Sequence, residues 1–338
     1  MKKQALNIFK YLLFLSIGVL LIWLAFRDKS EQEINEIWIS IQQADYFWLF
    51  VSVVVALISH FFRATRWKML LKPLGYQPKT SNTFFAVMVG YLANFAIHRI
   101  GEVTRCGLLT KYEKVPFTEG FGTVLAERAF DVICVIILFF LIFAIEFERI
   151  SAISNNLIFN PLLKKIHSLL ANPSSVIIIL AVLVIITAVF IYFRKKIRSV
   201  FSGKLKGFIV GLGNGLKSIK NVDKPLSFFV QTTLIWLMYV LQVYVCYFAF
   251  KGMGQLPFIS AIVIVVFGSL AVVAVPGGTG AYQIIVTSIL TTVYLVLETT
   301  ANAYAWAVWG VQFLIILFMG LVSLLLLAIL NKDVKEKV

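Results

Sequence analysis

Residues 121–145 read FGTVLAERAFDVICVIILFFLIFAI, a run that is long enough to cross a membrane and yet contains three charged side chains. A helix needs about 20 mostly apolar residues to cross the hydrocarbon of a bilayer. Comparable runs recur along the 338 residues, of which 60% are hydrophobic and 14% are charged, whereas soluble domains carry about 25% charged residues. Backbone groups in lipid must be hydrogen-bonded internally, and the runs do not alternate. The sequence therefore predicts an all-α, polytopic helical membrane bundle.

Six runs are long enough for full spans, and two more regions are apolar but broken in the middle. The first run has no cleavage site of small residues after it, so it is expected to be an uncleaved span. The broken regions, 81–113 and 258–297, are expected to be helical hairpins, either re-entrant or made of two short spans, which gives about eight transmembrane segments in all. The predicted full spans cover about 1–26, 46–62, 121–145, 174–193, 226–250 and 301–330.

The basic residues are distributed unevenly between the two sides of these spans. Of 31 Lys and Arg residues, 22 fall in segments on the same side as the N-terminus, including five in 63–79, and six fall on the other side. Cytoplasmic loops carry the excess of Lys and Arg, so both termini are predicted to be cytoplasmic. Because the net charge of +15 is concentrated between spans, anionic lipid is the expected partner, and nucleic acid is not.

The order of spans and hairpins predicts internal symmetry within a single integral membrane domain, 1–338. Residues 1–150 and residues 174–330 each contain two spans, a broken hairpin and another span, in opposite orientations. This is the pattern of an inverted repeat, in which interrupted helices at matching places point to a transport site. No residue identity links the two halves, so coincidental segmentation is the alternative.

The charges at membrane depth form two groups: Arg99, Glu102 and Arg105 in the first hairpin, then Glu127, Arg128 and Asp131 in the next span. A charge at the bilayer centre costs about 2.5–3.5 kcal/mol, so these side chains are expected to face a polar interior. The spacing of three puts the first group on one helical face. Since the six charges sum to zero, they can be ion pairs that pin the hairpin to the span. Alternatively, an arginine retains capacity for an anionic headgroup, or the carboxylates relay protons.

A second polar feature is VPGGTGAYQ at 275–283, which interrupts the second hairpin. Pro276 lacks an amide hydrogen, and Gly277, Gly278 and Gly280 permit unusual backbone angles. The helix that follows can present free amides and its positive dipole end to an anion; the alternative is a tight turn between apolar helices. The three cysteines and three histidines show no metal-binding spacing, so neither a metal nor a cofactor is expected.

Several of these stretches together resemble the transmembrane region of bacterial lysylphosphatidylglycerol synthases, a flippase-like family. The resemblance implies an eight-segment helical bundle in the bacterial inner membrane that moves a phospholipid between leaflets. The chain departs from the family pattern at His98, where proline is usual, and at Gln283, where glutamate is usual. The matching stretches are RATRWKMLL at 63–71, Asn94, RIGEVTRCGLL at 99–109, LAERAFDV at 125–132 and VPGGTGAYQ at 275–283.

We therefore expect a lipid flippase-like protein, and not an enzyme, that binds and translocates an anionic phospholipid or a polyprenyl-linked lipid. Only eight residues follow Leu330, six of them polar, so lipid aminoacylation is not expected. The alternatives are a membrane-embedded transferase that uses a lipid-linked donor, although the D-x-D pair of such enzymes is missing, and a non-catalytic partner of a separately encoded lipid-modifying synthase. A homodimer is also considered. The candidate headgroup-binding residues are Asn94, Arg99, Glu102, Arg105, Glu127, Arg128, Asp131, Pro276, Gly277, Gly278 and Gln283.

Overall fold

The computed structural model of this chain describes residues 30–96, 99–147 and 222–331. The predicted spans at 1–26 and 174–193, and most of the basic segment between 194 and 224, lie outside the described residues. The chain divides into two compact units, residues 1–142 with 215–338 and residues 143–214. Of the second unit, the structure describes residues 143–147.

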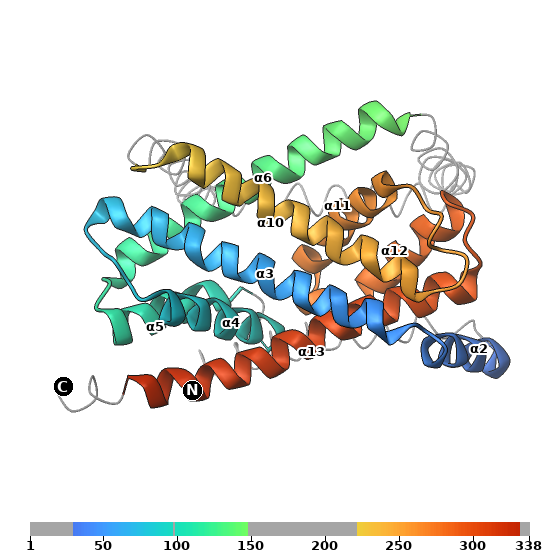
Figure 1. Cartoon of the computed structure of the whole chain (residues 1–338), viewed down its shortest axis with the longest axis horizontal. Coiled ribbons are helices and arrows are strands. Elements are labelled where there is room, and N and C mark those ends of the chain that lie inside the picture. Colours follow the sequence, from blue (N-terminus) through green and yellow to red (C-terminus); the bar gives the residue numbers. More distant parts are fainter. Residues whose placement is uncertain (1–29, 97–98, 148–221, 332–338) are drawn as a thin grey trace, which may run out of the picture. The chain divides into compact units, whose positions relative to one another are not determined.

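The described residues form nine α-helices and three short 3-10 turns, and they contain no strand (Figure 1). This confirms the predicted all-helical class. The turns are η1 (Lys72–Leu74), η4 (Cys246–Ala249) and η5 (Pro276–Gly278). The helices are α2 (Glu31–Gln42), α3 (Tyr46–Leu71), α4 (Thr80–Ala96), α5 (Gly101–Glu113), α6 (Phe117–Ile145), α10 (Pro225–Val245), α11 (Phe258–Ala274), α12 (Ala281–Thr292) and α13 (Glu298–Leu330).

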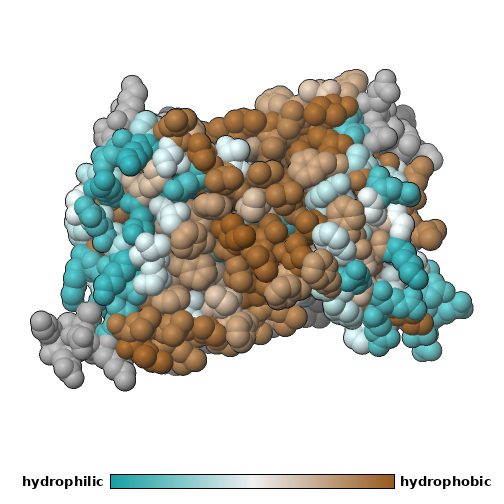
Figure 2. Space-filling view, viewed as in Figure 1, coloured by the Kyte–Doolittle hydropathy of each residue, from teal (hydrophilic) through white to brown (hydrophobic). Residues whose placement is uncertain are grey.

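Four of the described helices are long and apolar enough to cross a membrane: Tyr46–Leu74, Phe117–Ile145, Pro225–Ala249 and Glu298–Leu330. They coincide with four of the predicted spans. Large apolar side chains such as Phe50, Phe140 and Phe318 are exposed on them, and Figure 2 shows an apolar band between hydrophilic ends on the visible face. In water such a surface would be costly, so the chain is a multi-span helical membrane protein.

The four helices of the two predicted hairpins are shorter than the spans. α4 and α11 have 17 residues each, α5 has 13 and α12 has 12, against the roughly 20 that a bilayer requires. α4 packs against α5, α11 packs against α12, and α13 contacts both α4 and α12. Each broken region is therefore a pair of packed short helices.

The course of α3 differs from the prediction. The sequence interpretation ended this span near Phe62, at the first of the basic residues, and counted residues 63–79 as a cytoplasmic loop. The helix instead continues to Leu71, and Arg63 and Arg66 are buried in it. The physical reason is that nothing between Phe62 and Leu71 breaks a helix. Pro73 is the first residue that cannot continue it.

α3 also lies against α10, which runs in the opposite direction (Figure 1). Thr65 Oγ1 donates to Gln231 Oε1 at 3.0 Å, and the amide of Asp45, at the other end of α3, donates to the carbonyl of Ala249 at 2.9 Å. These contacts fix the register of the pair, and they bring the buried arginines of α3 next to polar side chains of α10.

Candidate functional site

Helices α3, α5 and α6 bring seven charged side chains together inside the first unit. We call these residues the charge cluster: Arg63 and Arg66 from α3, Glu102 and Arg105 from α5, and Glu127, Arg128 and Asp131 from α6.

Two carboxylates of α6 form the centre of the charge cluster. Glu127 is fully buried, and its Oε1 accepts from Arg63 Nη1 at 2.5 Å and lies 3.4 Å from Arg66 Nη2. Asp131 accepts from the same two residues, through Oδ2 at 2.9 Å and Oδ1 at 2.8 Å. Since residues four apart share a helical face, one face of α6 meets one face of α3.

α10 contributes hydrogen-bond acceptors to these arginines without adding charge. Tyr239 Oη accepts from Nε and Nη2 of Arg63, at 3.2 and 3.0 Å, and Thr232 Oγ1 accepts from Arg66 Nη1 at 3.2 Å. A buried charge is tolerated when ion pairs and hydrogen bonds satisfy it. These contacts explain how α3 can hold two buried arginines.

Arg105 joins the charge cluster from the opposite side of Glu127. Its Nη2 lies 3.1 Å from Glu127 Oε2, and its guanidinium carbon lies 4.6 Å from the centre of the Trp67 ring. The Trp67 Nε1 group donates to Thr123 Oγ1 at 2.9 Å, which fixes the ring. A cation over an indole face is stabilised by the ring quadrupole, so Arg105 is held by one charge and one ring.

The pair Glu102–Arg128 forms the edge of the charge cluster. Arg128 Nη2 lies 2.9 Å from Glu102 Oε1, and Arg128 Nη1 lies 3.5 Å from Asp131 Oδ2. The Arg128 side chain is 37% exposed and that of Glu102 is 20% exposed, whereas Arg66 and Glu127 are fully buried. Arg128 is therefore the member of the charge cluster that an approaching ligand can reach.

Arg99 does not lie where the sequence interpretation put it. α5 begins at Gly101, and Arg99 precedes it as an exposed residue with a left-handed φ of 62°. The expectation that three charges share one helical face therefore holds only for Glu102 and Arg105. Both of these are paired with α6, and no ion pair joins them to each other among the described residues.

The composition of the charge cluster also corrects the expected neutral set of six. Arg99 is absent from it, and Arg63 and Arg66 are present. Four guanidinium groups face three carboxylates, which leaves one net positive charge. In addition, Nε of Arg66, Arg105 and Arg128 has no hydrogen-bond partner in the described part of the chain.

Asn94 holds the tip of the first hairpin. Its Oδ1 accepts from the amide of Gly101 at 2.7 Å, as a capping side chain does at a helix start. A Cβ at Gly101 would collide with the carbonyl of Gly90, so α4 and α5 cross with backbone in contact. Asn94 thus positions α5 and its Arg105.

The break after Pro276 lies against the end of α4. Gly277, Gly278 and Gly280 have φ values of 61°, 70° and 77°, which other residues adopt only at a cost. A Cβ at Gly277 would collide with the ring of Phe95. The Gly277 carbonyl accepts from Trp309 Nε1 at 2.8 Å. The tips of the two hairpins, distant in sequence, therefore meet.

Gln283 lies in the first turn of α12, just after this break. Gln283 is 1% exposed, and neither its amide nitrogen nor its amide oxygen has a hydrogen-bond partner among the described residues. The two ring nitrogens of buried His60 are likewise without partners there, and the ring packs on Tyr91 at 4.9 Å. Leaving a buried polar group unpaired costs about 1–3 kcal/mol, so both sites have capacity for a further polar group.

The sequence interpretation missed Arg63, Arg66, Trp67 and Tyr239 as members or supports of the site. A signal for the first three was present: Arg-x-x-Arg-Trp continues an apolar helix and puts both arginines on one face. No signal pointed to Tyr239, because it is one of three tyrosines in the apolar span 226–250 and nothing in the sequence sets it apart.

Comparisons with known proteins agree with this architecture. Residues 8–320 match the family model described as "Lysylphosphatidylglycerol synthase TM region". The UPF0104 membrane protein MJ1595 of Methanocaldococcus jannaschii is 30% identical over 103 residues, a segment that covers 30% of this chain and 30% of that relative. No solved structure matches the chain. Since the family model covers most of its length, the chain belongs to the lysylphosphatidylglycerol synthase TM region family.

Proposed function

We propose that this protein binds the anionic headgroup of a membrane lipid, a phospholipid or a polyprenyl-linked lipid, and moves that lipid between leaflets. The observation that carries the proposal is the unequal charge of the charge cluster, with four guanidinium groups against three carboxylates. An uncompensated charge inside a membrane protein is costly. A bound phosphate would compensate it.

The free hydrogen-bonding capacity supports the same ligand. Nε of Arg66, Arg105 and Arg128 is unpartnered within the described residues. Guanidinium groups bind phosphate through two parallel N–H···O bonds, which a neutral headgroup cannot match in strength. Arg128, as the most exposed of the four, would make the first contact with the headgroup.

We propose transport rather than catalysis because of how the carboxylates are used. Glu127 lies within ion-pair distance of Arg63, Arg66 and Arg105, and Asp131 lies within that distance of Arg63, Arg66 and Arg128. A carboxylate shared by three cations is a poor general base and a poor ligand for a divalent metal. This disfavours a transferase with a lipid-linked donor.

The junction of the hairpin tips supports a pathway that continues from the charge cluster into the second half. Inverted-repeat transporters bind substrate where interrupted helices meet near mid-membrane. We propose that residues 1–150 and 174–330 are such repeats, with six spans and two re-entrant hairpins. The first-turn amides of α12 and the Gln283 side chain would then receive the headgroup.

We further propose that the protein lies in a bacterial inner membrane with both termini cytoplasmic. The charge distribution then puts Glu31, before α3, outside and Lys114, after α5, inside. In a chain without its own cysteines, a Cys at position 31 should react with an impermeant maleimide in intact cells. One at position 114 should react only after permeabilisation, and the reverse pattern would refute the orientation.

The central test is Arg105→Lys, which keeps the charge beside Glu127 but removes the planar fork. Transport of a mass-tagged anionic lipid in proteoliposomes should fall roughly tenfold, a change of about 1.4 kcal/mol, with thermal stability retained. The control is Lys111→Arg, an exposed exchange on the same helix, which should change neither property. Unchanged transport in Arg105→Lys would refute the headgroup role. If wild-type protein moves no lipid but co-purifies with a lipid-modifying synthase, the result would favour the alternative that the protein is a non-catalytic partner of that synthase.

A further inference from the structure

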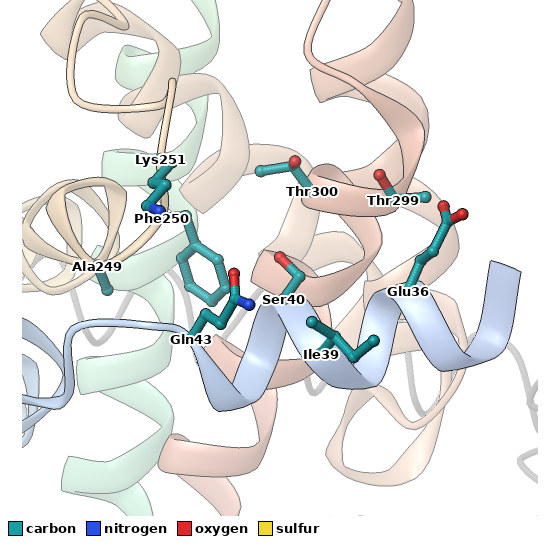
Figure 3. A pocket seen from close by; sticks show the side chains of 9 residues that line it. All are labelled: Glu36, Ile39, Ser40, Gln43, Ala249, Phe250, Lys251, Thr299 and Thr300. Carbon is teal, nitrogen blue, oxygen red and sulfur yellow. The ribbon is translucent and has the colours of Figure 1, made fainter. Parts of the chain in front are cut away.

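We propose that a second polar pocket, separate from the charge cluster, binds a zwitterion that carries a phosphate and a primary ammonium, such as a phosphoethanolamine group. The pocket has a volume of about 310 Å³, at the lower end of the roughly 300–1,000 Å³ of small-molecule sites. We call it the α2 pocket. Its polar lining residues are Glu36, Ser40, Gln43, Lys251, Thr299 and Thr300 (Figure 3).

One wall of the α2 pocket is a single face of α2. Positions 36, 39, 40 and 43 follow the spacing of residues that line up on one side of a helix. The helix is started by a capping box, in which Ser30 Oγ accepts from the Glu33 amide at 3.2 Å and the Ser30 amide donates to Glu33 Oε2 at 2.7 Å. This wall is therefore a regular helix whose start is fixed by its own capping residues.

Two other segments close the α2 pocket. The Asp45 amide, just after α2, donates to the carbonyl of Ala249 at 2.9 Å and ties α2 to the turn that carries Lys251. That turn is possible because Gly252 has a φ of 81°. Thr299 and Thr300 come from the first turn of α13, which packs against α2. Three segments distant in sequence thus share one cavity.

The charges of the α2 pocket are separated, in contrast to the paired charges of the charge cluster. Figure 3 shows Lys251 and Glu36 at opposite sides, with the hydroxyl and amide side chains between them. Neither residue forms a salt bridge within the described residues. Within the described part of the chain, Glu36 Oε1 accepts from the side-chain amide of Gln32, at 3.3 Å. The pocket therefore offers a cation and an anion that are both available.

The separated charges of the α2 pocket favour a ligand that carries both a negative and a positive group. A phosphate without an ammonium would be attracted by Lys251 and repelled by Glu36, and a neutral sugar would match neither charge. A primary ammonium can donate three hydrogen bonds to acceptors such as Glu36, Ser40 and Gln43, which a quaternary ammonium cannot do. The buried Phe250 and the side chain of Ile39 provide an apolar surface for the linking carbons.

The test uses the full chain in nanodiscs and ligand-observed NMR with O-phosphoethanolamine. Saturable binding is expected, with ethyl phosphate, ethanolamine and phosphocholine each binding at least roughly fivefold more weakly, since each lacks one charge-assisted contact. A second arm replaces the free ligand by phosphatidylethanolamine in the nanodisc and measures retained lipid by mass spectrometry. Binding of the free compound, or of the lipid alone, identifies the source of the group, and either result supports the proposal.

The variants Lys251→Gln and Glu36→Gln should each weaken binding roughly fivefold or more. Glu31→Gln, an exposed carboxylate on the same helix that does not line the pocket, is the control and should not change it. The charge reversals Glu36→Lys and Lys251→Glu should each weaken binding when made singly. The double exchange keeps one charge of each sign and should recover binding. Absence of saturable binding in both arms would overturn the proposal. The proposal would also be overturned if ethyl phosphate bound with the same affinity as O-phosphoethanolamine and Glu36→Gln left that affinity unchanged.

Discussion

The α4–α5 hairpin and the α11–α12 hairpin are each built from two short helices, but they reverse the chain by different means. In α4–α5 a side chain makes the connection, because Asn94 caps the start of α5 and the glycines at 90 and 101 let the helices touch. In α11–α12 the backbone does so, through three glycines with positive φ after Pro276. One tip depends on a hydrogen bond, and the other on residues that lack a side chain.

The two hairpins also differ in their polar content. α5 carries Glu102 and Arg105, and both find partners on α6. α12 carries Gln283, which is uncharged and has no partner in the described residues. An unpaired charge costs far more in a membrane than an unpaired amide. The first hairpin is therefore fixed to its neighbours by charge, while the second keeps a neutral polar group available.

The largest expected effect tests the charged side of this comparison. Glu127→Ala removes the carboxylate shared by three arginines and raises the net charge of the charge cluster from one to two. Breaking a buried ion pair costs about 3–5 kcal/mol, so thermal unfolding of the purified protein should shift to much lower temperature.

Glu119→Gln provides the control, because Glu119 is an exposed carboxylate on the same helix and should change stability by less than about 0.5 kcal/mol. If the double variant Arg105→Ala/Glu127→Ala, which keeps the net charge at one, is no more stable than Glu127→Ala, the charge balance is not what stabilises the first hairpin.

An intermediate effect is expected at the backbone turn of the second hairpin. Gly277→Ala adds a Cβ that collides with Phe95 and forces alanine into a left-handed φ. Together these should reduce stability by about 2–3 kcal/mol. Gly310→Ala is the matched control, since a Cβ there meets nothing within 4 Å of a helical glycine. It should be neutral or stabilising by up to about 1 kcal/mol, and equal losses at both positions would contradict the tip-to-tip contact.

The smallest effect on stability, and one of opposite sign, is expected at Gln283. Gln283→Met removes, at similar volume, an amide that has no partner among the described residues, so stability should stay constant or rise by up to about 1 kcal/mol, while transport of the anionic lipid should fall. Gln242→Met is the contrast, because buried Gln242 donates through Nε2 to Gln312 Oε1 at 2.7 Å and its loss leaves a partly buried acceptor without this bond. A clear loss of stability in Gln283→Met would mean that the amide already has a partner. The two hairpins would then not differ in whether their polar groups are paired.

Part of the site was readable in the sequence because it follows from local spacing. Glu102 and Arg105, three apart, were expected on one helical face and in ion pairs with the next span, and both pair with α6. The break at Gly277 was also located, since glycine and proline act on the backbone wherever they stand. Arg99 was misplaced because the exact start of α5 depends on a cap that Asn94 supplies from another helix.

The sequence by itself determined that this is a helical membrane protein, where its four described long spans lie apart from the end of α3, and which regions are broken. These properties depend on apolar run length and on turn residues, both of which act over short stretches of chain. Only the tertiary structure decided that Arg63 and Arg66 join Glu127 and Asp131, that Arg99 does not, and that α2, α13 and the turn at Lys251 line an open pocket. Ion pairs and cavities arise from the rotation and register of packed helices, and no single helix carries that information.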